Sequence, residues 1–286
     1  MIVIHKINVF ISFDIEGISA VSSWREVKKD SPDLPRMRSI ATGEVNAAIR
    51  GARKSGKPIG LITVCDSHAS GENILIDELE SGVTLIKGTP RKYYMMHGIS
   101  NEYDVVFLIG YHAMAGTRSG GMDHTYSSAS VYSIKINGQY VGETEINAAL
   151  AGYFRVPVGL VSGDDRLVKE VREFLGKEAE TVIAKRGISR AAAQCRHPKD
   201  VHQEIEAKAS RAIQKIKNLK PFTFKSPIRS EIDLASSMIA DVVELVPGIK
   251  RENGRKVTFK AKDILEFYRI LRLVCCLGGY ANSVLV

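Results

Sequence analysis

The sequence has little cysteine and no long apolar run. Of its four cysteines, Cys65 and Cys195 stand alone and Cys275-Cys276 are adjacent, so no C-x-x-C spacing occurs. This argues against a disulfide framework and against a zinc knuckle. No apolar stretch approaches the roughly eighteen residues of a membrane span, and the opening residues lack the pattern of a signal-peptide cleavage site. We therefore expect a cytoplasmic protein with no membrane partner.

The sequence also lacks a block of like charge, although it is basic overall. Its 40 lysines and arginines exceed its 32 acidic residues, giving a formal net charge of +8. The basic residues alternate with acidic ones in helical segments such as 169–173 and 204–208, without interleaved aromatics. This pattern is typical of a solvated surface and predicts no nucleic-acid partner. The positive potential could still favour anionic substrates.

Apolar runs alternate with a helical segment in the first part of the chain. Residues 7–13, 58–64 and 105–109 are rich in β-branched and aliphatic residues, as is typical of strands buried on both faces of a parallel sheet. Residues 36–55, between the first two runs, carry one apolar face and end at Gly56, which indicates a helix. Strand, helix, strand is the signature of an α/β fold.

The pattern of charged and apolar residues changes toward the C-terminal third. Residues 199–217 read as a charged helix, residues 228–234 alternate like a half-exposed strand, and an apolar helix begins near residue 262. We predict an α/β fold with a largely parallel sheet flanked by helices. Residues 1–190 form the catalytic domain in this prediction, and residues 191–286 form a smaller α/β subdomain packed on it.

Carboxylates and histidines follow three of the predicted strands. Asp14 and Glu16 come directly after residues 7–13, and their i, i+2 spacing lets both side chains converge on one point. His68 follows the second strand and His112 the third. The carboxyl ends of parallel strands line one edge of a sheet, where ligands bind. Two anions held together there repel each other unless a cation lies between them.

Glu143, at a predicted junction of hairpin and helix, could add a third carboxylate to the same edge. Two histidines and three carboxylates suit a pair of divalent ions with one bridging carboxylate. Each residue alone has an ordinary alternative, because a histidine after a strand can be a cap or a core residue, and Glu143 can favour a helix start through the dipole. The coincidence of three strand ends favours the metal site.

The ordered motifs of this chain resemble those of the D-aminopeptidase family, peptidase family M55, related to a bacillar dipeptide-transport operon protein. The resemblance spans roughly residues 7–190, and the ordered set is far more specific than any single motif. The matching motifs are Asp14-Ile15-Glu16-Gly17-Ile18-Ser19, Asp66-Ser67-His68, Gly110-Tyr111-His112-Ala113, Met122-Asp123-His124, Val141-Gly142-Glu143, Asn147-Ala148 and Gly163-Asp164-Asp165-Arg166.

The resemblance implies a two-zinc aminopeptidase that hydrolyses short peptides with an N-terminal D-amino acid, such as D-Ala. It also implies a homo-oligomer, a decamer of two stacked pentameric rings. Asp123 stands beside His124, the catalytic histidine that the resemblance implies, at a position where the family pattern has a serine. A carboxylate close to His124 would raise the pKa of its imidazole. Carried over by position, the metal ligands are Asp14, Glu16, His68, His112 and Glu143, with Asp14 bridging, and the catalytic residue is His124.

Two roles for His124 stay open at this point, namely nucleophile and general acid or base. A metal hydroxide is already a competent nucleophile, which favours the acid or base role. Two other functions also remain. A metal-dependent phosphoesterase would suit the ligands and the basic charge, but no glycine-rich phosphate loop or arginine cluster lies beside them. A non-catalytic peptide-binding component of a transport system would use the metals structurally.

Overall fold

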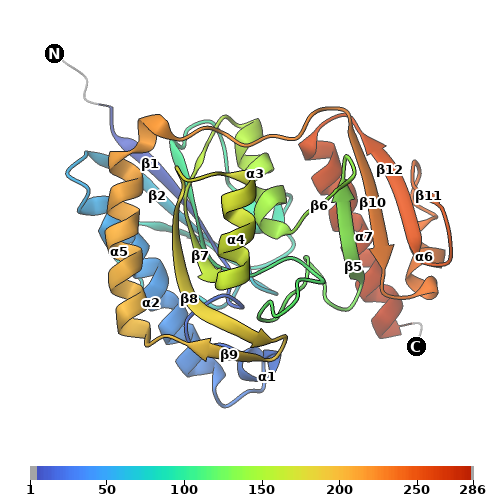
Figure 1. Ribbon diagram of the computed structural model, residues 1–286, viewed down its shortest axis with the longest axis horizontal. Helices are drawn as coiled ribbons and strands as arrows, with labels where there is room; N and C mark the ends of the chain where they lie inside the picture. Colours follow the sequence, from blue (N-terminus) through green and yellow to red (C-terminus); the bar gives the residue numbers. More distant parts are fainter. Residues whose placement is uncertain (1–4, 285–286) are drawn as a thin grey trace.

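The computed structural model describes residues 5–284, in which the chain forms two sheets (Figure 1). Within this range sheet A has seven strands in the order β3-β2-β1-β4-β7-β8-β9, all parallel to their neighbours except β9. This confirms the predicted largely parallel sheet. Its strands are β1 (Ile7–Phe13), β2 (Ile59–Asp66), β3 (Thr84–Ile86), β4 (Val105–Tyr111), β7 (Val158–Asp164), β8 (Glu180–Ser189) and β9 (Ala192–Cys195).

Sheet A is covered on both faces, which explains the continuous apolar runs of its central strands. Every residue of β4 is buried, and alternate residues of β1 enter two separate apolar cores. Helices α2 (Leu34–Arg53) and α5 (Pro198–Gln214) pack together on one face. The other face is covered by α3 (Glu143–Tyr153), α4 (Asp165–Phe174) and the 3-10 turn η1 (Tyr94–Met96). The short helix α1 (Trp24–Val27) and the turn η2 (Ile216–Asn218) complete this part.

Sheet B is antiparallel, and its strand order is β11-β12-β10-β5-β6. Its first hairpin turns at Asn137-Gly138, where both residues have positive φ (51° and 85°), as a tight two-residue hairpin requires. The elements of this layer are β5 (Val131–Ile136), β6 (Gln139–Tyr140), β10 (Ile228–Leu234), β11 (Lys250–Arg251), β12 (Lys256–Ala261), α6 (Ser237–Val243) and α7 (Ile264–Val284).

The chain enters and leaves the two sheets more than once. Strands β5 and β6 come from the middle of the sequence and join sheet B, whereas β9 and α5, which follow residue 190, pack with sheet A. The domain boundary at residue 190 stays a prediction. Helix α3 directly follows β6 and therefore lies where the two sheets meet (Figure 1).

Between residues 5 and 284, no helix combines the length and the apolar character needed to cross a membrane.

Gly17 lets the loop after β1 press against the end of β4. Its backbone N–H donates to the Gly110 carbonyl at 2.7 Å. A Cβ at position 17 would lie 1.7 Å from the Tyr111 carbonyl oxygen, a distance that no side chain tolerates. Because residue 17 has no side chain, the segment with Asp14 and Glu16 can lie directly beside the strand end that carries His112.

Replacing Gly17 by alanine should force these two backbone segments apart. We expect Gly17→Ala to lower the free energy of unfolding by about 1–3 kcal/mol, as overpacking does. Gly279→Ala is the matched control, because this exposed helical glycine has no neighbour within 4 Å of the added Cβ. This control substitution should raise the free energy of unfolding by ~0.5–1 kcal/mol. Urea unfolding of both variants measures the difference, and equal stabilities would contradict the close approach.

Candidate active site

Five of the six predicted site residues line a cavity of about 210 Å³ at the carboxyl-end edge of sheet A, and His112 lies behind them. Loops after β1, β2 and β4 reach this edge, and α3 reaches it from the junction with sheet B. The cavity is lined by Asp14, Glu16, Trp24, Ser67, His68, Ala69, Tyr94, Met95, His124, Tyr126, Ser127, Ser128, Ala129 and Glu143.

Asp14, Glu16 and His68 form one group of possible metal ligands. The Nδ1 atom of His68 lies 2.9 Å from Glu16 Oε2 and 3.3 Å from Asp14 Oδ1. The loop that presents His68 is fixed by the buried Asp66, whose carboxylate accepts N–H groups from Asn73 and Ile74. These three ligand atoms therefore face one another, as the i, i+2 spacing predicts for the two carboxylates.

His112 and Glu143 face each other on the opposite side of Asp14. His112 Nε2 lies 3.4 Å from Glu143 Oε1 and 3.6 Å from Asp14 Oδ2. Its Nδ1 donates to the Ala113 carbonyl at 2.9 Å, which leaves Nε2 as the atom that faces the carboxylates. Glu143 in turn accepts the backbone N–H of Tyr126 at 2.6 Å. Asp14 therefore presents one oxygen to each histidine.

His124 lies in the same cluster, with its ring stacked on His112 at 4.1 Å between centroids and 9° between planes. Its Nε2 lies 3.8 Å from Glu16 Oε1 and 3.7 Å from Glu143 Oε1. Its Nδ1 donates to the Met122 carbonyl at 3.0 Å. The structure thus brings all six predicted site residues together, and His112, His124 and Glu143 also meet the geometric conditions of a ligand group.

The crowded carboxylates perturb one another strongly. Burial raises the pKa of the Asp14 carboxyl well above its usual range, and the charge of Glu16 raises it further. Burial also acts to raise the pKa of Glu16, but the facing His68 imidazole outweighs it and holds that pKa well below its usual range. Burial acts to lower the pKa of His112, but Glu143 and Asp14 raise it to about 10. The carboxylates likewise raise the pKa of His68 well above its usual range, so they hold His68 and His112, but not His124, as cations.

The donor set fits a divalent metal. Among residues 5–284, His112 Nε2 is a buried nitrogen without a hydrogen-bond partner, although it faces two carboxylates. An atom in that position costs free energy unless something binds it. Imidazole nitrogens and carboxylate oxygens are the ligands that zinc accepts. They form two groups here, and Asp14 faces a histidine of each group.

The Asp123 carboxylate binds groups other than His124. One oxygen accepts the backbone N–H of Gly116 at 2.7 Å, and the other lies 3.2 Å from Arg190 Nε. Burial lowers the pKa of His124, and the stacked His112 lowers it further. The serine-to-aspartate difference therefore does not place a carboxylate against the histidine.

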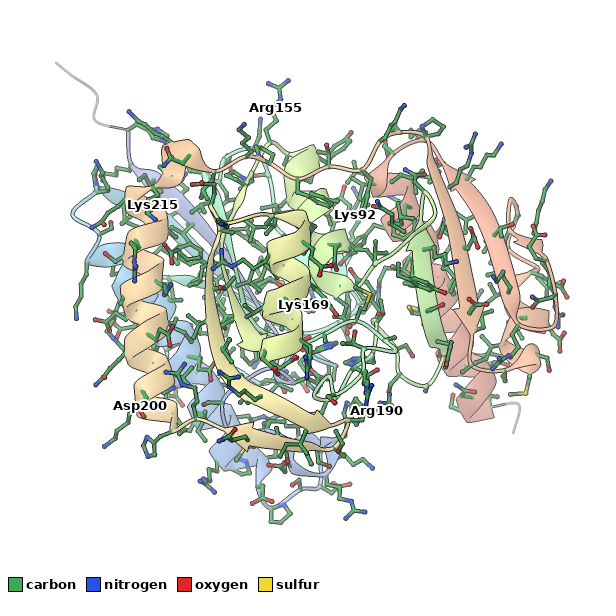
Figure 2. The ribbon with its side chains drawn as sticks, viewed as in Figure 1. Lys92, Arg155, Lys169, Arg190, Asp200 and Lys215 are labelled. Carbon is green, nitrogen blue, oxygen red and sulfur yellow. The ribbon has the colours of Figure 1, made fainter. Side chains whose placement is uncertain are left out.

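Arg190 connects Asp123 to the wall of the cavity. It lies between β8 and β9, and Figure 2 shows it beside the irregular loops that lead to β5. Its guanidinium lies 5.0 Å from the centroid of the Trp24 ring. The Trp24 ring meets His124 edge to face, with centroids 5.7 Å apart. Arg190 therefore supports both the wall residue Trp24 and the loop that carries His124.

Several cavity residues were not expected from the sequence. Trp24 is the only tryptophan of the chain, but it stands in a polar stretch that carries no strand-end signal. Tyr94 and Tyr126 line the cavity with positive φ values of 36° and 59°, which side-chain-bearing residues rarely adopt. A lone aromatic in a polar segment is a signal that could have found Trp24, whereas no sequence pattern identifies the two tyrosines.

A buried polar network centred on Asn147 supports the site. Asn147 of α3 donates to the Tyr111 hydroxyl at 3.0 Å. Its amide oxygen accepts the hydroxyls of Tyr126 at 2.9 Å and Tyr268 at 3.1 Å. Asn147 thus joins β4, α3, α7 and the cavity loop at one point, one helical turn from Glu143.

Comparisons with known proteins give one consistent result. The sequence profile of a family described as D-aminopeptidase matches residues 7–273. A D-aminopeptidase of Bacillus subtilis (strain 168) is 34% identical over 263 residues, which are 92% of this chain and 94% of that protein. The solved structure of DppA from Bacillus subtilis, described as a Zn-dependent D-aminopeptidase and a self-compartmentalizing protease, has a TM-score of 0.91 at 32% identity, covering 96% of this chain and 98% of that one.

Removing the Arg190 guanidinium should loosen Trp24. We expect Arg190→Gln to lower the free energy of unfolding by about 1 kcal/mol, through loss of one cation–π contact and one partly exposed ion pair. It should also shift the fluorescence emission of Trp24. Arg186→Gln, which removes an exposed arginine of β8, is the control. Identical emission spectra of the two variants and the wild type would rule out this support.

Proposed function

This chain belongs to the D-aminopeptidase family, peptidase family M55, and we propose that it is a zinc-dependent aminopeptidase acting on short peptides with an N-terminal D-residue such as D-Ala. The observation that carries the proposal is that two ligand groups, Asp14-Glu16-His68 and His112-His124-Glu143, lie together, with Asp14 facing a histidine of each group. The zinc dependence of DppA, a structural match over nearly the whole chain, supports the choice of metal.

The ligand assignment follows from which atoms face each other. Asp14 Oδ1, Glu16 and His68 Nδ1 would hold one zinc ion. Asp14 Oδ2, Glu143 and His112 Nε2 would hold the second. Asp14 is the bridging ligand in this assignment because its two oxygens are directed at different histidines. When bound, two such ions supply Lewis acidity that polarises a scissile carbonyl and brings the pKa of water near neutrality.

His124 is the residue that moves protons in this proposal. Because its Nδ1 donates to the Met122 carbonyl, its Nε2 is the atom that faces the cavity. Burial and His112 lower its pKa, which keeps Nε2 unprotonated and able to accept a proton from the attacking water. The same atom then gives that proton to the amine nitrogen as the peptide C–N bond breaks.

The stacked His112 and the edge of Trp24 fix the orientation of the His124 ring. A base that is held in one orientation transfers a proton without first losing rotational freedom. The family membership favours this peptidase function over the phosphoesterase and over a non-catalytic peptide-binding component.

The name of DppA as a self-compartmentalizing protease supports an assembly for this chain as well. We propose a closed homo-oligomer in the cytoplasm, with the decamer of two pentameric rings as the expected form. Enclosure would restrict substrates to short peptides.

Hydrolysis of D-Ala-D-Ala and L-Ala-L-Ala tests the function directly. The protein should be assayed with zinc restored and again after chelation. We expect zinc-dependent release of D-alanine from the D-peptide and little release from the L-peptide. Equal cleavage after chelation would contradict the metal requirement, and no cleavage of either peptide would contradict the assigned substrate class.

Replacing His124 should separate catalysis from metal binding. We expect His124→Ala to lower kcat by about 10²–10⁴-fold, the usual contribution of a general acid or base. Its zinc content, measured by atomic emission, should stay near that of the wild type. Loss of zinc in this variant would instead make His124 a ligand.

Replacing the ligand residues should lower the zinc content together with the rate. We expect one ion to be lost in His68→Ala and in His112→Ala, because each histidine faces a different oxygen of Asp14. Asp14→Ala should lose both ions. Full zinc occupancy in the two histidine variants would show that the ligand assignment is wrong.

A further inference from the structure

Strand β8 carries none of the predicted site residues, but it contains a fully buried lysine, Lys185. Lysine is almost never fully buried unless a partner takes up its charge. Between residues 5 and 284, the hydrogen bonds of the Lys185 ammonium go to two main-chain carbonyls, those of Glu16 and Val21. One of these carbonyls belongs to a predicted metal ligand.

The two carbonyls lie in the loop that follows β1. Glu16 stands near the start of this loop, and Val21 lies shortly before α1, the short helix that carries the cavity residue Trp24. Between them, the backbone N–H of Ser19 donates to the buried Glu44 carboxylate at 2.8 Å. The Lys185 ammonium therefore joins the two ends of the loop and fixes the main chain from which the Glu16 side chain extends.

The methylene chain of Lys185 contacts a second loop of the site. A Cβ built on Gly121 would lie 3.4 Å from Lys185 Cε, so the loop that carries His124 packs on the lysine. The same loop is tied to the end of β8, because the backbone N–H of Met122 donates to the Arg190 carbonyl at 2.8 Å. Lys185 thus lies between the loop of Glu16 and the loop of His124.

A charge at this position is costly. Burial lowers the pKa of Lys185, and the charges of Asp164 and Glu16 act against that shift. An apolar residue of similar size could fill the same space without the cost of removing an ammonium from water. The presence of lysine therefore indicates a role for its N–H donors, and those donors hold the backbone of Glu16.

We propose that Lys185 is a positioning residue for the zinc ion that Asp14, Glu16 and His68 would bind. The inference rests on the proposed function and adds a residue to its metal site. Groups that hold a metal ligand in place, without touching the metal, commonly contribute tenfold to a hundredfold in affinity. Lys185 supplies such a contact through the main chain, so that the Glu16 carboxylate faces His68 before the ion arrives.

The second ion should not depend on Lys185. Its ligands His112 and Glu143 stand after β4 and on α3. They are fixed by other contacts, namely those to the Ala113 carbonyl and to the Tyr126 backbone N–H. A purely structural lysine would instead affect both ions alike, through the stability of the whole sheet.

Zinc titration of metal-free protein against a chromophoric chelator tests this difference. Lys185→Met keeps the methylene chain and removes the N–H donors. We expect the affinity for one zinc ion to fall about tenfold to a hundredfold, and the affinity for the other to stay unchanged. Combined with His112→Ala, the substitution should weaken the remaining ion, whereas combined with His68→Ala it should have no further effect. Lys208→Met is the matched control, because Lys208 binds Glu180 of the same strand at 2.8 Å.

Hydrogen exchange of the metal-free protein gives a readout that needs neither zinc nor turnover. In Lys185→Met the backbone amides of residues 14–22 should exchange about tenfold faster, as loss of a hydrogen bond predicts. The amides of residues 66–74, in the loop of His68, should keep their rates. A general loss of stability would accelerate both segments, and Lys208→Met shows the size of that effect.

Lys185→Gln, with a shorter neutral donor, serves in both measurements if Lys185→Met does not fold. Equal weakening of both zinc ions, or unchanged exchange of residues 14–22, would overturn the inference. Binding of fewer than two zinc ions by the wild type would instead contradict the proposed metal site. The exchange rates would then still decide whether Lys185 holds the loop of Glu16.

Discussion

Three carboxylates buried within reach of one another impose the main constraint on this structure. Asp14, Glu16 and Glu143 are at most 3% exposed, and buried charges are costly unless opposite charges balance them. Protonated His68 and His112 can supply that balance, and bound divalent ions can supply it more completely. The parallel strands, the glycine contact after β1 and the placement of α3 all serve to hold these groups together.

Part of the site depends on elements outside the parallel strand ends. Helix α3 carries both Glu143 and Asn147, and Asn147 bonds to residues of β4, of α7 and of the cavity loop. The backbone of Tyr126 in that loop donates to Glu143. The position of one metal-facing carboxylate is therefore coupled to the packing of sheet B and α7 against sheet A.

The sequence predicts those parts of the site that follow from strand periodicity. The buried runs identify parallel strands, and parallel strands bring Asp14, His68 and His112 to one edge. Other features depend on contacts between segments far apart in the chain, which periodicity does not record. The turn at Asn137-Gly138 predicts a hairpin, but not that the hairpin pairs with β10. Likewise the support of Trp24 by Arg190 and the contact of Lys185 with the Glu16 carbonyl exist only once the layers have packed.

Anomalous X-ray diffraction at the zinc edge, from crystals of zinc-loaded protein, tests the central claim most directly. The account predicts two peaks in the cavity, one among Asp14, Glu16 and His68 and the other among Asp14, His112 and Glu143. A single peak, or peaks away from Asp14, would contradict the shared site.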